Sequence, residues 1–417
     1  MSPYTRPESV EEFHGPYGPY HVSELVLQKI WLEQAFDEGR LRDEQGRRVQ
    51  VVFPGTWNRL EGPDFRGALL RVDGLDVRGD VEVHFSQADW KAHGHEENPA
   101  YDNVVLHVLY YDPGEGAPEC RTSCGTVLPR VSLLPLLWYS LEEYAGDDSL
   151  VASTGVDLRP EVESLLQHDL SDRKKRLRDL AERRWGMKRH FAKLRLERLG
   201  WEGACHQSTL EVLGFARNRV PMLMIAERFG MDAFVGGKLP VDLLMGVAGN
   251  RWRLNGCRPA NHPRTRLQQY MDLVSVVPAW PENLALFGQA IEEVGHKLKE
   301  EEWGTSEARM DLGIQKLRKS MVALVLGGKL GGTRLDTLIC DALFPLVSAR
   351  LGVDCFALWF HWPAGDRPDS CVEALKLLQV LEPRKVLMSN GWLQGVLGAK
   401  SVSNKETQGV ESVQAHA

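Results

Sequence analysis

The sequence has no apolar run approaching the roughly 20 residues needed to cross a bilayer. Its first twenty residues also lack the basic and then apolar pattern of an export signal. Seven cysteines, an odd number scattered along 417 residues, do not suit a disulfide framework. These absences favour a protein of the reducing cytoplasm that has no membrane partner.

Several motifs for catalysis and nucleotide binding are also missing. There is no G-x-S-x-G nucleophile elbow and no glycine-rich phosphate loop of either common type. The glycine-rich stretch Gly327–Gly332 lies between two helical patterns rather than after a strand, which is a poor nucleotide signal. A net charge of −7 gives no whole-chain signal for nucleic acid, although local patches can still be basic.

The length allows two or three domains. We expect an irregular arm over residues 1–20, a mixed-sheet α/β domain over 21–150, a mostly helical domain over 151–399 and a disordered polar tail over 400–417. The expected fold class is therefore α+β or α/β. The sequence does not indicate an oligomeric state.

Helix and strand signals alternate in the first domain. Ser23 is a candidate cap for a helix with Glu24 in its first turn. Apolar or alternating runs predict strands at Val49–Phe53, Phe65–Val72, Asp80–Phe85 and Val104–Tyr111, and a shorter strand within Gly125–Val131. Asp73-Gly74 fits a hairpin turn. Later patterns predict a long helix or helix pair over Asp169–Leu199, and helices near 208–230, 264–276, 281–300, 307–326, 333–351 and 370–381.

The residues with the clearest chemistry lie between Asn58 and His107. In the run from Asp80 to Phe85, alternation puts Glu82 and His84 on one strand face. The hairpin would bring Asp64 beside Glu82. Two carboxylates next to an imidazole predict a metal site with a base beside it. The plainer alternative is that Asp64 is a turn residue and that Glu82 and His84 face solvent.

The order helix, three strands, short helix, strand, with Pro63-Asp64 and then Glu82-Val83-His84, resembles the PD-(D/E)xK phosphodiesterase and nuclease superfamily. The resemblance implies a restriction-endonuclease-like core. It also implies that Asp64 and Glu82 bind Mg²⁺ or Mn²⁺, with Glu24 as an accessory ligand. His84 stands where that superfamily has lysine, and a histidine is near half-protonated around pH 6.5. It could therefore act as a base or a ligand rather than as a fixed cation.

A histidine cluster gives a competing interpretation. His84, His93, His95 and His107 lie within 24 residues, and imidazole-rich sets suit Zn²⁺ or another transition metal better than Mg²⁺. Alternatively, His93 and His95 are surface residues of a polar loop, and His107 is a hydrogen-bonded core histidine.

The chain also resembles an uncharacterised bacterial family known only as a domain of unknown function, DUF2851. The motifs that carry the resemblance are Asn58-x-x-Glu61-Gly62-Pro63-Asp64-Phe65, Gly79-Asp80-Val81-Glu82-Val83-His84, Ser86-x-x-Asp89-Trp90-x-x-His93-Gly94-His95, Tyr101-x-Asn103-Val104-Val105-Leu106-His107-Val108, Arg258-Pro259-Ala260-Asn261-His262-Pro263-x-x-Arg266 and Asn390-Gly391-Trp392-Leu393-Gln394-Gly395. They span about residues 20–398. The resemblance brings no established activity.

Basic residues in the helical part are candidates for a phosphate-binding face. They are Arg173, Lys174, Lys175, Arg176, Arg264 and Arg266. The plainer alternative is a solvated helix face for the charge run 173–198 and a packing corner for the loop beside Arg264 and Arg266. We therefore expect a metal-dependent phosphodiesterase of nuclease type acting on DNA or RNA, with Asp64, Glu82 and His84 at its centre. Two alternatives are a non-catalytic nucleic-acid-binding or scaffold protein on a degenerate nuclease core, and a histidine-rich transition-metal protein.

Overall fold

A computed structural model describes residues 10–15, 18–114, 116–139, 141–145, 158–237, 239–255, 257–295, 304–381 and 387–399. The chain divides into two compact units, Met1–Asp147 and Asp148–Ala417. The first unit is a mixed α and β structure and the second is helical, so the broad expectation of an N-terminal mixed sheet followed by helices is confirmed. The expected polar tail at 400–417 lies outside the described residues.

Where the sequence suggested an irregular arm over residues 1–20, the described residues 10–15 and 18–20 belong to a strand pair, and residues 1–9, 16 and 17 lie outside the described part of the chain. β1 (Val10–Gly15) and β2 (Gly18–Ser23) pair antiparallel. Helix α1 (Glu24–Glu33) follows directly. Ser23 occupies the N-cap position, but its side chain makes no capping hydrogen bond. The helix buries Leu27, Ile30 and Trp31 and packs against the sheet at β6.

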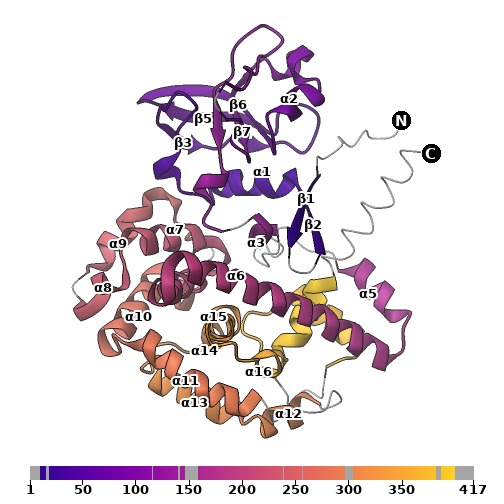
Figure 1. The fold of residues 1–417 in the computed structure, drawn as a ribbon, viewed down its shortest axis with the longest axis vertical. Coiled ribbons are helices and arrows are strands. Elements are labelled where there is room, and N and C mark those ends of the chain that lie inside the picture. The colour runs from indigo at the N-terminus through magenta and orange to yellow at the C-terminus, as the bar shows by residue number, and fades with distance from the viewer. Residues whose placement is uncertain are drawn as a thin grey trace. The chain divides into compact units, whose positions relative to one another are not determined.

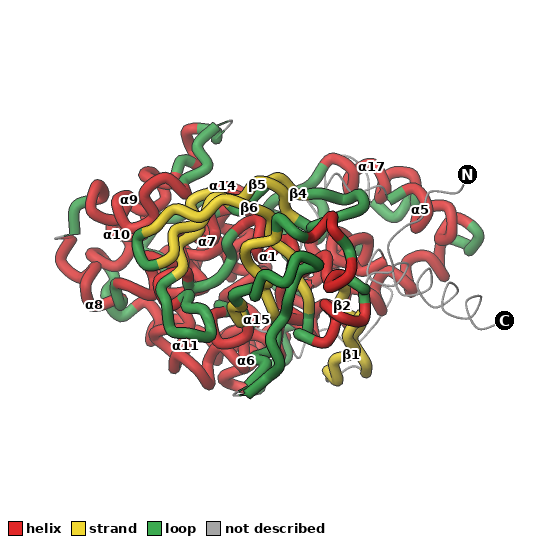
Figure 2. Tube along the Cα trace, turned by 90° about the horizontal axis from the view of Figure 1, so that it is seen from above, coloured by secondary structure: helices red, strands yellow, loops and turns green. Residues whose placement is uncertain are grey.

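Six strands form the main sheet of this unit (Figure 1). They are β3 (Val49–Phe53), β4 (Thr56–Trp57), β5 (Phe65–Val72), β6 (Leu75–His84), β7 (Val104–Leu109) and β8 (Arg130–Ser132). The order is β3-β5-β6-β7-β8, with β4 paired to β5. Pairing is antiparallel from β3 to β6 and parallel from β6 to β8. β5 and β6 run side by side in Figures 1 and 2.

The β5–β6 hairpin follows from its turn residues. Asp73 and Gly74 have φ of 45° and 88°, the left-handed values that a two-residue hairpin turn requires. Shorter elements complete the unit: η1 (Glu38–Arg40), α2 (Ala88–Ala92), η2 (His95–Glu97), η3 (Pro99–Tyr101), η4 (Leu134–Leu136) and α3 (Leu141–Ala145). The last predicted strand is shifted toward the C-terminus, to Arg130–Ser132.

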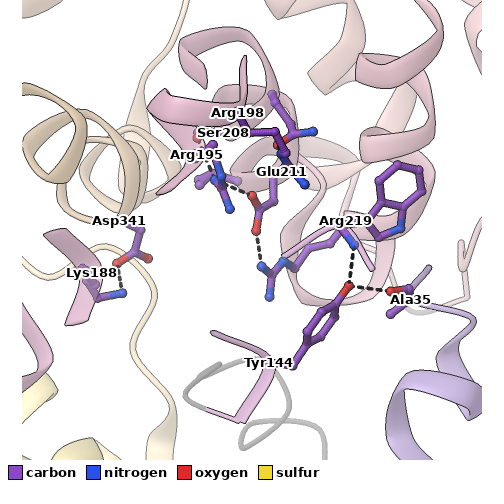
Figure 3. A network of polar contacts seen from close by, with 12 residues as sticks. Ala35, Tyr144, Lys188, Arg195, Arg198, Ser208, Glu211, Arg219 and Asp341 are labelled. Atoms are coloured by element: carbon purple, nitrogen blue, oxygen red, sulfur yellow. Dashed lines mark hydrogen bonds and ion pairs between the residues drawn. The ribbon is translucent and has the colours of Figure 1, made fainter. Parts of the chain in front are cut away.

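The second unit is built on one long helical segment, α6 (Leu170–Leu213). Gly200 interrupts it with φ of 69°, so the predicted helix over Asp169–Leu199 is the first arm of a helical pair. Across the break, Glu211 accepts hydrogen bonds from Arg195 at 2.9 Å and from Arg219 of α7 (Figure 3). This buried carboxylate ties both arms of α6 to α7.

The helices in the described part of this unit, besides α6, are α5 (Arg159–Leu166), α7 (Phe215–Arg228), α8 (Met231–Phe234), η5 (Val235–Gly237), α9 (Val241–Ala248), η6 (Gly249–Arg251), η7 (Pro259–Asn261), α10 (Pro263–Val276), α11 (Trp280–Gly295), α12 (Thr305–Asp311), α13 (Ile314–Leu324), α14 (Gly332–Leu338), η8 (Ile339–Leu343), α15 (Phe344–Leu351), α16 (Phe356–His361) and α17 (Asp369–Leu377). Helix α6 packs chiefly against α7, α8, α10, α11, α14, η8, α15 and α16. Residues 390–399 are also helical. A single apolar core that includes Trp280, Phe344 and Trp359 runs through most of them. In the described part of the chain, no helix combines the length and apolar character that a membrane crossing requires.

Candidate metal centre

Strand β6 carries two of the candidate residues at its C-terminal end. Glu82 and His84 are two positions apart and therefore share a face, as the alternation predicts. Both side chains are fully buried, so the alternative that they face solvent is wrong. The sheet face that the sequence marks as polar is covered by the segment after β6, whose His93 and His95 rings contact the His84 ring.

That covering segment positions His93 and His95. The backbone N–H of Ser86 donates to Asp89 Oδ2 at 2.8 Å and helps to start the short helix α2. His93 is the C-cap residue of α2, and Gly94 follows it with φ of 70°, a left-handed turn that glycine adopts without strain. His95 opens η2, and its ring stacks on that of Tyr101 at 3.8 Å between centroids.

Three of the four candidate histidines converge. One ring nitrogen each from His84, His93 and His95 lies within 4.8 Å of the others. His93 Nδ1 is 3.2 Å from His84 Nε2. Over the described residues, this is the one group of three or more histidine, cysteine, aspartate or glutamate side chains that lies close enough together to hold an ion.

Glu82 places a carboxylate oxygen beside two of these nitrogens. Its Oε1 lies 3.4 Å from His84 Nε2 and 3.2 Å from His95 Nε2. Neighbouring ligand atoms around a tetrahedral ion with metal–nitrogen bonds of about 2.0–2.1 Å are about 3.3–3.4 Å apart. The two distances from Glu82 Oε1 and the 3.2 Å between His93 Nδ1 and His84 Nε2 lie near that value. Glu82 nevertheless lies outside the group of side chains whose ligand atoms all converge within 4.8 Å.

His107 occupies a different position from the other three histidines. It lies on β7 opposite Glu82 in the parallel register, and its Nε2 is 2.8 Å from His84 Nδ1. Burial lowers the pKa of His107 to about 3, with smaller contributions from His95 and Arg130, so its imidazole is neutral near pH 7. This contact fits the alternative in which His107 is a hydrogen-bonded histidine of the core.

Asp64 makes a different set of contacts from the one expected of a shared metal ligand. Its Oδ2 accepts the backbone N–H of Val83 at 3.0 Å, and its Oδ1 accepts Gln28 Nε2 at 2.9 Å. Its own backbone N–H donates to Glu82 Oε2 at 2.8 Å. Asp64 and Glu82 are thus neighbours, as the hairpin predicts, and Asp64 is 2% exposed. Its two oxygens both face protein donors.

Helix α1 contributes a residue that the sequence did not single out. Gln28 lies one turn after Glu24 and joins Asp64 to Trp57, whose indole N–H donates to Gln28 Oε1 at 2.9 Å. Glu24 is the first residue of α1 and is buried, but it is not part of the ion-holding group. The magnesium triad of Asp64, Glu82 and Glu24 stays a prediction. Only the i, i+4 spacing from Glu24 hinted at Gln28.

The basic candidates lie in the helical unit and differ in their surroundings. Lys174, Lys175 and Arg176 are exposed on α6, whereas Arg173 donates to the backbone carbonyls of His168, Leu166 and Leu378. The remaining pair lies on α10. Arg264 pairs with Asp242, and Arg266 is buried against Asn261 and Gln269. Three of the six residues are therefore presented to solvent without a described partner.

A family model for proteins of unknown function, DUF2851, matches residues 24–249, more than half of the chain. The matched range holds the Asn58–Val108 motifs and ends before the motifs at Arg258 and Asn390. Neither the curated proteins nor the solved structures include a match to this chain.

Proposed function

Since the chain belongs to the DUF2851 family of proteins of unknown function, we propose its function from its own residues: the N-terminal unit binds one transition-metal ion. The ligands are His84, His93 and His95, and Glu82 Oε1 is the fourth donor or the carboxylate beside the ion. The observation that carries this proposal is the convergence of three ring nitrogens within 4.8 Å.

The donor set decides between classes of ion. Imidazole nitrogen suits Zn²⁺, Cu²⁺, Ni²⁺ and Fe²⁺, whereas Mg²⁺ requires oxygen ligands and retains several waters. Three imidazoles and one carboxylate in a buried setting therefore favour Zn²⁺ or a chemically similar ion. Of the three histidines, His93 is the one with partial solvent exposure, so an ion would enter from its side.

Such an ion would supply Lewis-acid chemistry and lower the pKa of a bound water. Catalytic zinc sites commonly have three histidine ligands and a fourth coordination position open to water or substrate. Four protein ligands instead make a closed, structural site. Glu82 decides which of these applies. As a ligand it closes the site, and as a neighbour it is placed to accept a proton from a bound water.

Metal analysis of the full-length protein, purified without a histidine tag, tests the proposal. After chelator treatment, we expect one Zn²⁺ or Co²⁺ to bind per chain in a titration, and Mg²⁺ at the same concentration not to compete. His93→Ala should weaken binding strongly, and His190→Ala, a partly exposed histidine of α6, serves as the matched control. If the wild type and both variants bind Zn²⁺ and Co²⁺ equally weakly, the proposal is wrong.

The second candidate is a Mg²⁺- or Mn²⁺-dependent phosphodiesterase acting on DNA or RNA. What supports it is the order α1, β3, β5, β6, α2, β7, with β7 parallel to β6, together with the neighbouring Asp64 and Glu82. In that case the purified protein nicks nucleic acid, and Asp64→Ala and Glu82→Ala abolish the cleavage. Salt-sensitive binding without turnover would instead indicate a non-catalytic nucleic-acid-binding protein.

A further inference from the structure

We propose that His107 is a positioning residue of the metal centre rather than a ligand. It accepts a hydrogen bond from the Nδ1–H of His84 and so leaves the lone pair of His84 Nε2 for the ion. This inference rests on the proposed transition-metal site and assigns a separate role to the fourth histidine of the cluster.

The geometry of the His84–His107 pair carries the assignment. His84 Nδ1 and His107 Nε2 are 2.8 Å apart, and both side chains are fully buried. The other nitrogen of His84 faces His93 Nδ1 at 3.2 Å. Each nitrogen of the His84 ring therefore has a distinct neighbour, with the candidate ligands on one side and His107 on the other.

A metal ion on His84 would set the direction of this hydrogen bond. His107 would then carry its own proton on Nδ1, a buried atom for which the described residues offer no hydrogen-bond partner. A metal on His84 Nε2 requires the ring proton on Nδ1, and an Nδ1–H needs an acceptor when it is buried. His107 Nε2 is the atom in place. The 2.8 Å separation between His84 Nδ1 and His107 Nε2 is that of a hydrogen bond. Such outer partners orient a ligand ring and raise its basicity.

The structure also holds the His107 ring in place. The backbone N–H of His107 donates to Pro129 O at 3.0 Å, and the ring centroids of His107 and Trp90 are 5.2 Å apart. The indole of Trp90 in turn donates to Arg121 O at 2.9 Å. His107 does not belong to the group of side chains whose ligand atoms converge within 4.8 Å.

A matched pair of variants in the full-length protein tests the role. His107→Gln keeps a carboxamide oxygen that can accept from His84, and His107→Met has a similar size without that acceptor. The probe is Co²⁺ alone, followed by displacement with Zn²⁺. We expect His107→Met to bind about 10- to 100-fold more weakly than the wild type, and His107→Gln to recover most of that loss.

A spectroscopic readout separates positioning from ligation. The visible absorption of bound Co²⁺, and the number of nitrogen neighbours from X-ray absorption, should be the same in the wild type and in both variants. Loss of one nitrogen in His107→Met would make His107 a ligand and overturn the assignment, as would equal affinities for all three proteins. A wild type that binds neither metal would overturn the metal centre itself, and this assignment with it.

Discussion

The backbone N–H of Asp64 donates to Glu82 Oε2 at 2.8 Å, so these two acidic residues are joined through a main-chain donor. Asp64 uses its side chain elsewhere, on Val83 N–H and Gln28. The Asp64 carboxylate therefore fixes β5, β6 and α1 together, while Glu82 Oε1 faces the histidines.

Asp64→Ala should destabilise the protein without removing the proposed metal centre. The substitution leaves the Val83 N–H and the Gln28 amide of a buried site without their acceptor, at a cost of about 3 kcal/mol. The backbone N–H that donates to Glu82 is retained. Urea unfolding gives the stability, and a Zn²⁺ titration of the folded variant gives the affinity, which we expect within a few-fold of the wild type. A folded Asp64→Ala protein without divalent-metal binding would favour the magnesium site instead.

Gly79→Ala should disrupt the contact between β6 and β7. A Cβ at Gly79 would lie 2.3 Å from Val105 Cγ1 and 2.6 Å from the backbone oxygen of Asn103. Backbone atoms of a central sheet cannot move cheaply, so we expect a loss of about 1–3 kcal/mol in unfolding free energy. Gly246→Ala in α9 is the control, because its Cβ would meet open space and alanine favours a helix. Equal stabilities of the two variants would contradict the tight packing at Gly79.

Glu211→Gln should weaken the helical unit. Glu211 is buried and pairs with both Arg195 and Arg219, so the substitution removes the negative charge that two largely buried guanidinium groups share. We expect a loss of about 3 kcal/mol in unfolding free energy. The exposed pair Lys193–Glu197 on the same helix is the comparison, and Glu197→Gln should change stability by less than about 1 kcal/mol. Chemical denaturation of both variants measures the difference. Similar losses of stability would contradict a special role for the pairing of Glu211 with Arg195 and Arg219.

The stability of the helical unit should fall as the solution becomes acidic. Burial lowers the pKa of His206 to about 4, against about 6.5 in an unfolded chain. Above pH 6.5 both states are neutral at this residue. Between pH 6.5 and 4 the unfolded chain takes up a proton that the folded chain does not, which costs up to about 3 kcal/mol of stability.

His206→Gln isolates this contribution. The variant cannot titrate in that range, so its unfolding free energy should fall less than that of the wild type between pH 7 and 4.5. Urea unfolding at both pH values measures the two differences. Parallel losses in the wild type and the variant would show that His206 does not drive the change.

Local sequence patterns predicted β3, β5, β6, β7 and the β5–β6 turn, because these features depend on neighbouring residues. Alternation located β6, and Asp73-Gly74 located the hairpin. The same alternation suggested one buried face, yet Glu82 and His84 are buried as well. That burial depends on how the segment after β6 folds back, and strand periodicity carries no information about it.

Contacts between residues far apart in the sequence could not be predicted either, because local patterns do not say which segments pack together. Gln28 and Asp64 are 36 positions apart, and the stacking of Tyr101 on His95 depends on η2 and η3. The spacing of the four histidines correctly indicated that they lie close together. It could not show that three of them converge on one point while His107 contacts His84 from another side. The strand pair at the N-terminus was also missed, because its proline, glycine and aromatic residues resemble those of an irregular arm.

Anomalous scattering at the zinc edge, from crystals of the protein grown with Zn²⁺, would show directly whether the three histidines bind an ion. We expect one peak in the N-terminal unit, about 2.0–2.1 Å from a ring nitrogen of each of His84, His93 and His95. No peak among these rings, or a peak bound instead by the carboxylates of Asp64 and Glu24, would contradict the proposed metal centre.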